Sequence, residues 1–455
     1  MNLLYLHTHD SGRVLSPFGA KVPTPNLEQF SRSALTFQNC YCVGPTCSPS
    51  RAALLTGRYP HQNGMLGLAQ RGFSMDYTQH LAQFLGRSGY HTALCGIQHE
   101  RGWYLDTQKS HGKAIGYDEE LTLPTEGYPK EELHHWDMEN AKTAAKWLKE
   151  RKGEKTPFFL SYGMHCTHRP FPVEVDPSVN ENAAVPPPHI PNSPETRHDF
   201  AQYLTSAKWA DDCMGVVLTA LKEAGLEEDT VVFYTTDHGL ANPYTKCSLF
   251  DSGIGVALIL RVPGARGNGR VCDSLVSHLD VFPTLCDVLR LPKPGYLEGV
   301  SLLPCLEDPT AEVRNAVFAQ VNFHTSYEPI RCIRTQRYKY IRWFDDSHLL
   351  TNPSNTDESP TKAYFSQYGF ETRAKPREAL YDLVYDTGER NNLIDAPAYA
   401  AVAEDLRRRL REEMERTDDP LLRGPVPIQP GWKVNKPDCQ KASSKDPNDY
   451  VSLGE

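Results

Sequence analysis

The feature that most constrains the fold of this chain is an alternation of short apolar runs with amphipathic helical patterns along its first two-thirds. The apolar runs contain few polar positions, which predicts strands that are buried on both faces. The predicted strands are Leu3–His7, Thr92–Gly96, Phe158–Met164, Thr230–Thr236 and Val256–Val262. The predicted helices are Pro25–Ala34, Gln79–Ser88, Asn140–Arg151 and Pro194–Ala224. Together they predict an α/β fold, a large mainly parallel sheet sandwiched by helices, with ligands bound beyond the carboxyl ends of its strands.

The pattern changes near Arg314, where short strand-like segments separated by turns begin. These segments are Asn315–Phe323, Cys332–Thr335, Tyr338–Phe344 and Leu380–Tyr385. A charged helix is predicted over Ala398–Arg416, and the tail after Gly424 is polar and is expected to be irregular. We therefore expect a large α/β domain over residues 1–313 and a smaller C-terminal subdomain, an antiparallel sheet plus a helix, over residues 314–455.

Charge and hydropathy exclude several classes of protein. Lys plus Arg number 48 against 57 Asp plus Glu, a net charge of −9, which argues against a nucleic-acid partner but leaves room for a local basic pocket. No stretch approaches the roughly 18 apolar residues of a membrane span, so no membrane partner is expected. The start, Met1–His7, lacks the basic flank of a signal peptide. As the chain stands this predicts a cytoplasmic protein; a leader removed earlier would place it in the periplasm or outside the cell.

The number and spacing of the cysteines indicate whether they form disulfides, bind zinc or stay as reduced thiols. There are 12 of them, and they are scattered without CxxC pairs. This pattern favours reduced thiols over a disulfide framework or a zinc cage. A thiol oxidoreductase is also disfavoured, because no resolving cysteine stands at CxxC spacing.

Cys47 opens the most informative short segment, CSPSRAALLTGR. Pro49 and Ser50 suit a helix start, the alanines and leucines that follow favour a helix, and Gly57 suits its end. A helix N-terminus presents free N–H groups and a positive dipole end to an anion, and Arg51 adds a fixed charge. We expect the Cys47 thiol to have a lowered pKa there and to be reactive. The alternative is an ordinary buried cysteine before a structural helix.

This segment resembles the signature of the sulfatase family, Cys-x-Pro-Ser-Arg followed by Leu-Thr-Gly-Arg. The resemblance implies that a maturation enzyme oxidises Cys47 to formylglycine (3-oxoalanine), whose hydrated aldehyde is the nucleophile. It continues through HQNGM at residues 61–65 and, less evenly, to LYDL at residues 380–383, so it covers nearly the whole chain. It is nearest to the sulfamidase, or N-sulfoglucosamine sulfohydrolase, branch. It also implies that the C-terminal subdomain completes a substrate pocket.

Two acidic pairs follow predicted strands, His9-Asp10 after the first and Asp237-His238 after a later one. If both strands are central and parallel, the pairs meet at one edge of the sheet and suit a divalent metal. Either pair taken alone is as well explained as a cap of a helix or turn. The resemblance implies calcium bound by Asp10, Asp237, His238 and the formylglycine of Cys47. His9 stands where the family has an aspartate, so it is either a further ligand or an outer residue, and with His238 it makes manganese or zinc alternatives.

The resemblance implies further roles around the nucleophile. Arg51 would hold the geometry of the formylglycine, and His99 would take the proton whose removal expels sulfate. Ile97 stands where the family has a lysine, which removes one positive charge from the expected anion cage. Without the resemblance, a lone histidine such as His99 is more simply structural.

Three more residues are implied on the substrate side. His168 and Lys246 would hold the sulfate, and one of them would protonate the leaving atom. His324 lies where the branch has histidines that contribute to the sugar pocket. Without the resemblance, a lysine in a polar loop is simply solvated and His324 is a loop histidine.

These residues predict a sulfatase that hydrolyses a sulfate ester or sulfamate of a sugar, with N-sulfoglucosamine of heparan-type saccharides as first choice. A sulfate is a poor electrophile because its oxygens are negative, so its cleavage needs charge neutralisation, a strong nucleophile and protonation of the leaving atom. A formylglycine-dependent phosphonate monoester or phosphodiester hydrolase is the alternative, favoured by His238 and the missing lysine. A non-catalytic protein that binds sulfated sugars is a third reading, in which Cys47 stays a thiol. The sequence predicts no particular oligomeric state.

Overall fold

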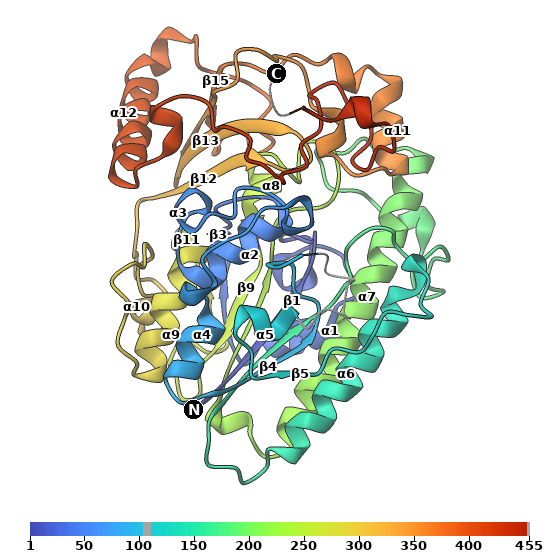
Figure 1. Ribbon diagram of the computed structural model, residues 1–455, viewed down its shortest axis with the longest axis vertical. Helices are drawn as coiled ribbons and strands as arrows, with labels where there is room; N and C mark the ends of the chain where they lie inside the picture. The colour runs from blue at the N-terminus through green and yellow to red at the C-terminus, as the bar shows by residue number, and fades with distance from the viewer. Residues whose placement is uncertain (103–110, 453–455) are drawn as a thin grey trace.

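A central sheet of eight strands organises the protein, as seen in a computed structural model that describes residues 1–102 and 111–452 (Figure 1). In spatial order its strands are β10 (Val271–Cys272), β2 (Leu35–Phe37), β9 (Leu258–Arg261), β7 (Thr230–Thr236), β1 (Asn2–Thr8), β6 (Phe158–Gly163), β4 (His91–Gly96) and β5 (Glu119–Glu120). Strand β9 is antiparallel to β2 and to β7, and the other neighbouring pairs are parallel. The prediction of a large, mainly parallel sheet is confirmed.

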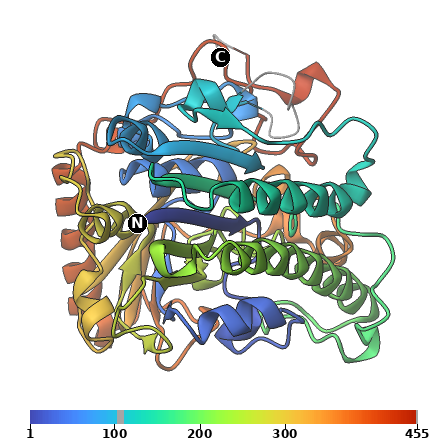
Figure 2. The same cartoon turned by 90° about the horizontal axis from the view of Figure 1, so that it is seen from below.

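Helices cover both faces of this sheet, and β1 shows why the apolar runs lack polar alternation. On one face, Leu3 and Tyr5 belong to an apolar cluster with side chains of α4 (Leu81–Arg87) and α9 (Val281–Leu289). On the other face, Leu4 and Leu6 pack in a cluster with side chains of α6 (Leu133–Glu150) and α7 (Pro194–Glu223). Figure 2 shows α6 and α7 side by side, and α1 (Pro25–Ser31) contacts α7. A strand covered on both sides needs no polar face.

The segment predicted as one strand, Val256–Val262, is divided between two sheets. Its start, β8 (Gly255–Val256), belongs to a three-stranded sheet with β11 (Val276–Ser277) and β3 (Cys40–Tyr41). The chain then crosses at Ala257, whose N–H donates to the carbonyl of Gly12 over 3.0 Å, and continues as β9 in the central sheet. The prediction of one continuous strand was wrong because an apolar run does not reveal which strands it pairs with.

The C-terminal part forms the predicted antiparallel sheet. Its strands, in order, are β12 (Ala316–Phe323), β13 (Tyr327–Thr335), β14 (Tyr338–Trp343) and β15 (Glu378–Asp382). Helix α12 (Ala400–Arg416) buries Leu406 and Leu410 in one apolar cluster with side chains of this sheet. The remaining helices include α10 (Leu303–Glu307) and α11 (Pro360–Gln367). Within residues 1–102 and 111–452, no helix combines the length and apolar character needed to cross a membrane.

A group of charges connects the C-terminal sheet to the part of the chain that carries the central sheet. Lys339 on β14 is fully buried, and its Nζ lies 2.5 Å from Asp251 Oδ1 and 2.8 Å from Glu389 Oε1. Arg334 on β13 adds a contact of 3.2 Å to Asp251 Oδ2. Glu389 also accepts a hydrogen bond from the Asp251 backbone N–H, at the start of α8 (Asp251–Ile254), over 2.5 Å. Because buried charges are stable only when compensated, these ion pairs hold the two parts in one arrangement.

We expect Lys339→Met to lower the free energy of unfolding by about 3 kcal/mol, because it leaves Asp251 and Glu389 buried with less positive charge beside them. Urea unfolding measures the change. Lys142→Met is the matched control, because Lys142 is exposed and pairs with Glu139 at the surface over 2.7 Å. The control should change stability by less than about 0.5 kcal/mol. Equal stability of Lys339→Met and the unchanged protein would contradict the expectation.

Candidate active site

The carboxyl ends of β1 and β7 bring the two acidic pairs together. These strands are adjacent and parallel, with Thr8 paired to Thr236, so the residues that follow them emerge at the same edge. The Asp10 N–H donates to Asp237 Oδ1 over 2.9 Å. Asp10 has a φ of 33°, a backbone region that aspartate tolerates better than most residues. The sequence prediction that these pairs meet therefore agrees with the geometry.

Cys47 reaches the same place from the N-terminus of α2 (Cys47–Thr56). Its Sγ lies 3.4 Å from His238 Nε2. The helix begins at Cys47 itself and ends at Gly57, which has the predicted left-handed conformation with a φ of 64°. Ser50 is not a cap, contrary to expectation, because it lies inside the helix and donates its hydroxyl to the Asp237 carbonyl over 2.5 Å. That bond fixes the helix against the end of β7.

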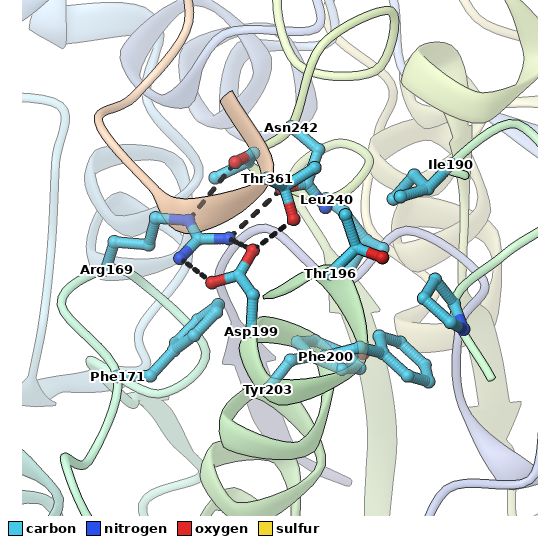
Figure 3. Close-up of a pocket in the computed structure, with 12 residues that line it drawn as sticks. Arg169, Phe171, Ile190, Thr196, Asp199, Phe200, Tyr203, Leu240, Asn242 and Thr361 are labelled. Atoms are coloured by element: carbon cyan, nitrogen blue, oxygen red, sulfur yellow. Dashed lines mark hydrogen bonds and ion pairs between the residues drawn. The ribbon is translucent and has the colours of Figure 1, made fainter. Parts of the chain in front are cut away.

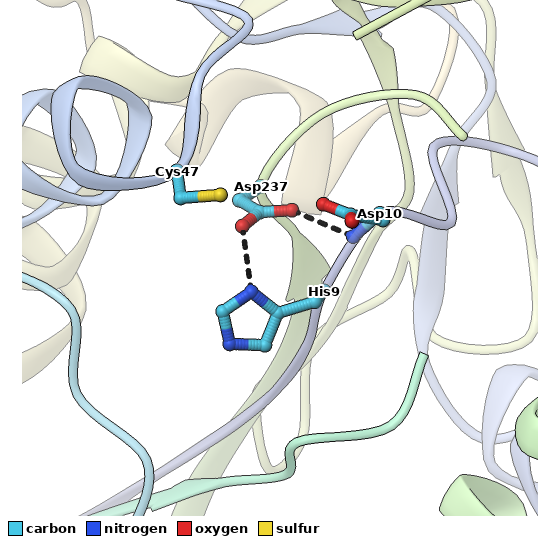
Figure 4. A group of neighbouring side chains, drawn as sticks. All are labelled: His9, Asp10, Cys47 and Asp237. Atoms are coloured by element: carbon cyan, nitrogen blue, oxygen red, sulfur yellow. Dashed lines mark hydrogen bonds and ion pairs between the residues drawn. The ribbon is translucent and has the colours of Figure 1, made fainter. Parts of the chain in front are cut away.

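Four side chains form a compact cluster with the atoms that metals prefer. One nitrogen, sulfur or carboxylate oxygen from each of His9, Asp10, Cys47 and Asp237 lies within 4.8 Å of the others, and all four residues are buried (Figure 4). Asp10 Oδ1 accepts no hydrogen bond from residues 1–102 or 111–452. Carboxylate oxygens with an imidazole suit a divalent cation, and the buried oxygen of Asp10 keeps lone pairs for one. The residues present therefore fit a metal.

The imidazole of His238 presents a defined nitrogen to this cluster. Its Nδ1 donates to the Gly239 carbonyl over 2.9 Å, so the lone pair of the neutral ring is on Nε2. That Nε2 lies 3.2 Å from Asp10 Oδ1. His9, which belongs to the cluster, contacts Asp237 instead of Asp10. The distance between His9 Nδ1 and Asp237 Oδ2 is 3.2 Å. His238 is thus available as a ligand beside Asp10, and His9 lies against the other acidic residue.

Arg51 lies beneath the cluster and holds Asp237. Its Nη2 donates to Asp237 Oδ2 over 3.1 Å and to the Thr8 carbonyl over 3.0 Å. Its Nη1 donates to His7 Nδ1 over 2.6 Å. Although burial alone would raise it, the pKa of Asp237 is held well below its usual range by His238, Arg51 and His9. His7 was missed from the sequence, although its spacing of two from His9 in a strand places both on one face.

The expected activation of the Cys47 thiol was wrong. Burial raises the pKa of the Cys47 thiol well above its usual range, and the Asp10 and Asp237 carboxylates raise it further, which outweighs the opposing effect of Lys246 and Arg51. Cys47 is 1% exposed. The rule for helix N-termini applies to partly exposed thiols, whereas this one is enclosed and lies beside two carboxylates. As an unmodified thiol, Cys47 is a weak nucleophile.

Two further imidazoles, those of His99 and His168, lie near His9 of this cluster. The ring centre of His9 lies 5.3 Å from that of His168 and 6.3 Å from that of His99. His99 Nε2 donates to Gln70 Oε1 over 2.7 Å, and Gln70 carries no sequence signal that could have identified it. Ile97, where a lysine was expected, is buried in an apolar cluster with Leu133 and Trp136. Ile97 therefore packs in the apolar core and supplies no positive charge of its own to the site.

Lys246 supplies a buried positive charge next to the cluster. Its Nζ lies 3.2 Å from Asp10 Oδ2 and 2.8 Å from Asp357 Oδ2, and its side chain is 1% exposed. Burial lowers the pKa of Lys246, but the two carboxylates raise it, and the net result is well above the usual range. Asp357 follows a short turn in the C-terminal part, and sequence reasoning missed it because it belongs to no motif.

His324 approaches the same region from the C-terminal sheet. It directly follows β12 and is 4% exposed. In the part of the chain that the structure describes, its Nδ1 has no hydrogen-bond partner. Burial, and then the charge of Lys246, lowers the pKa of His324 well below its usual range. All of the sequence-predicted site residues therefore gather around one buried region.

Comparison with known proteins places this arrangement in a family. A family model described as sulfatase matches residues 7–291, and one described as N-sulphoglucosamine sulphohydrolase, C-terminal, matches residues 237–358. The N-sulphoglucosamine sulphohydrolase of Homo sapiens is 27% identical over an alignment 477 positions long. The alignment covers 93% of this chain and 92% of the human protein.

Solved structures share the fold. A protein in complex with its substrate, D-glucosamine-2-N,6-O-disulfate, aligns with a TM-score of 0.67 and 20% identity over 92% of this chain and 98% of its own. A phosphonate monoester hydrolase from Silicibacter pomeroyi aligns with a TM-score of 0.72 and 19% identity over 92% of this chain and 96% of its own. At such identities the structures establish the fold alone, whereas the sulfatase model spans more than half of the sequence. The protein belongs to the sulfatase family of hydrolases.

Proposed function

We propose that this enzyme removes sulfate from a sulfated sugar, with the sulfamate of N-sulfoglucosamine in heparan-type saccharides as first choice. The observation that carries the proposal is the cluster of Asp10, Cys47 and Asp237 within 4.8 Å, with the Lys246 ammonium 3.2 Å from Asp10. This grouping supports a nucleophile at residue 47, a set of metal-binding donors and a cation for the sulfate that act together. The match to an N-sulphoglucosamine sulphohydrolase C-terminal region supports the choice of sugar.

A divalent metal is the proposed cofactor. Asp10, Asp237 and His238, with the oxygen of the modified residue 47, would hold it, and His9 is a further candidate ligand. When bound, the metal would polarise the sulfuryl oxygens and acidify the hydrated formylglycine. Calcium is the choice implied by the family, and the imidazoles of His238 and His9 make manganese and zinc its competitors.

The chain's own residues perform the remaining tasks in this proposal. A formylglycine at Cys47, made by a maturation enzyme, provides the hydroxyl that attacks sulfur. Arg51 keeps Asp237 in place through their 3.1 Å contact. His99, whose Nε2 donates to Gln70, has its lone pair on Nδ1 and acts as the base that takes the proton when sulfate is expelled.

The sulfate would be bound on the opposite side from Arg51. Lys246 neutralises part of the negative charge on the sulfate, and His168, whose Nδ1 donates to the Arg169 carbonyl over 2.5 Å, would contact the sulfate with the other side of its ring. One of these two residues protonates the departing oxygen or nitrogen. We also propose that residues 314–455 act as a subdomain that completes the substrate pocket, because His324 and Asp357 come from it. His324 would then contact the sugar.

Hydrolysis of phosphonate monoesters or phosphodiesters is the second candidate function. It is favoured by His238, whose Nε2 lies 3.2 Å from Asp10 Oδ1, and by the apolar packing of Ile97, where a further cation for sulfate was expected. The fold shared with the Silicibacter pomeroyi hydrolase is compatible with it. The non-catalytic alternative is not retained, because the chain belongs to a family of hydrolases.

A defined substrate panel separates the two candidates. The protein is produced together with a formylglycine-generating enzyme and assayed with N-sulfoglucosamine, O-sulfated N-acetylglucosamines, nitrophenyl sulfate and nitrophenyl phenylphosphonate. We expect kcat/KM for N-sulfoglucosamine to exceed that for the phosphonate by at least about 100-fold, a difference of about 2.7 kcal/mol in the barrier. Faster turnover of the phosphonate would reverse the order of the proposals.

A further inference from the structure

Asp357 occupies the solvent side of the site. Its side chain is 21% exposed, whereas those of Lys246 and Asp10 are 1% and 0% exposed. The Lys246 ammonium lies between the two carboxylates, 3.2 Å from Asp10 Oδ2 and 2.8 Å from Asp357 Oδ2. The charges therefore alternate outward from the metal-binding cluster, from Asp10 through Lys246 to Asp357.

A network of hydrogen bonds fixes the surroundings of Asp357. Arg169, in the loop after β6, donates to both carboxylate oxygens of Asp199 over 2.6 and 2.7 Å (Figure 3). It also donates to Asn242, in the loop after β7, over 3.0 Å. Thr361 of α11 donates to the same Asp199 over 2.5 Å. Because Thr361 lies shortly after Asp357 in the chain, the network holds the carboxylate-bearing segment against the loops after β6 and β7.

The negative charge of Asp357 determines which groups of a bound substrate its carboxylate can contact. A sulfate held by Lys246 and His168 is repelled by a carboxylate, so Asp357 must face another part of the substrate. Although burial alone would raise it, the pKa of Asp357 is held below its usual range by Lys246, then by His168 and His324. An ionised carboxylate only accepts hydrogen bonds. Its partner on the substrate is therefore an O–H or N–H group, and a cationic nitrogen is the strongest such donor.

We infer that Asp357 accepts a hydrogen bond from the nitrogen of the leaving group and so makes the enzyme favour sulfamates of amino sugars over sulfate esters. The inference rests on the function proposed above and assigns the choice of substrate to one residue. When the S–N bond breaks, the sulfuryl group passes to the hydroxyl oxygen of the nucleophile. The nitrogen keeps the bonding electron pair and takes one proton from Lys246 or His168, and the proton that the attacking hydroxyl loses replaces it. The amine then takes up a second proton from water, and Asp357 holds the resulting ammonium. A sulfate ester yields a neutral hydroxyl at this position, which gains less from a carboxylate.

The substrate ratio of Asp357→Asn tests this assignment. We expect the variant to lose about 10- to 100-fold in kcat/KM for N-sulfoglucosamine, as when a hydrogen bond to a charged group is removed. The loss for 6-O-sulfated N-acetylglucosamine should stay below about 3-fold. Glu358→Gln is the matched control, because Glu358 is an exposed neighbour that pairs with Lys362 over 2.5 Å. An equal loss for both substrates would reduce Asp357 to a partner of Lys246 and overturn the assignment.

Product inhibition gives a second measurement that needs no turnover difference. In the unchanged, formylglycine-bearing enzyme, glucosamine should inhibit at a concentration about 10-fold or more below that of glucose, and Asp357→Asn should remove the difference. Equal inhibition by the two sugars in the unchanged enzyme would overturn the assignment. If the unchanged enzyme does not cleave N-sulfoglucosamine, the proposed substrate and this inference both fail. If it does, and the variant keeps the same substrate ratio, only the inference fails.

Discussion

Cys47→Ala is expected to reduce kcat for sulfate release by at least about 10,000-fold, the scale of loss when a covalent nucleophile is removed. This large expected loss follows from the position of residue 47. Residue 47 opens α2 and presents its Sγ 3.4 Å from His238 Nε2, inside the cluster with Asp10 and Asp237. Alanine fits the helix, so the fold should persist while the reacting atom is lost.

Peptide mass spectrometry identifies the chemical form of this residue. The active enzyme should carry a peptide about 18 Da lighter at Cys47 than the thiol form, the difference between a thiol and an aldehyde. Cys286→Ala is the control, because Cys286 is a buried cysteine of α9 outside the site, and its kcat should stay within about 3-fold of the unchanged value. Full activity of Cys47→Ala, or of a preparation in which residue 47 is entirely thiol, would refute the nucleophile.

Asp237→Asn should reduce kcat/KM by more than about 1,000-fold and lower the metal content of the purified protein. The Asp237 carboxylate is contacted by Arg51 over 3.1 Å and by His9 over 3.2 Å, and it accepts N–H groups from Asp10 and His238, each over 2.9 Å. An asparagine keeps one acceptor oxygen but loses the negative charge, which leaves Arg51 buried without its counter-ion and removes one of the proposed metal ligands.

Metal analysis beside the assay distinguishes this result from simple unfolding. The variant should retain a cooperative thermal transition while binding less than one metal per chain. Asp212→Asn is the control, because Asp212 is 40% exposed and pairs with Lys208 on α7 over 2.9 Å. Normal metal content together with normal activity in Asp237→Asn would contradict the assignment of this residue to the metal site.

The sequence predicted most of the scaffold because buried parallel strands leave a strong local signal. The strand Thr230–Thr236 has the predicted bounds, and the antiparallel C-terminal sheet is where the turn-separated segments predicted it. The crossing at Ala257 could not be predicted, because an apolar run carries no information about its pairing partners. Likewise, the pKa of Cys47 depends on complete enclosure and on two carboxylates from distant segments, which a local helix rule does not include.

Two of the residues missed at the site share one property. Gln70 and Asp357 each contact the site through a single side chain from a segment that has no other chemical signal. Their positions follow from how the C-terminal part and the loop around Gln70 are placed on the sheet, and spacing along the chain does not encode that placement. The residues found from the sequence belong to motifs, whereas Gln70 and Asp357 were found only from the tertiary structure.

The burial of Cys47 has a consequence for the timing of maturation. Because only 1% of Cys47 is exposed, a second enzyme cannot bind this segment or reach the Cys47 sulfur once α2 has packed. Every residue from Cys47 to Thr56 is buried in the finished fold, so local fraying does not expose it either. In the proposed maturation, oxidation of Cys47 therefore precedes folding, while the segment is still an extended peptide. A molecule that folds before it is modified keeps its thiol. The fraction of thiol-bearing molecules in a preparation therefore reports the rate of modification relative to the rate of folding.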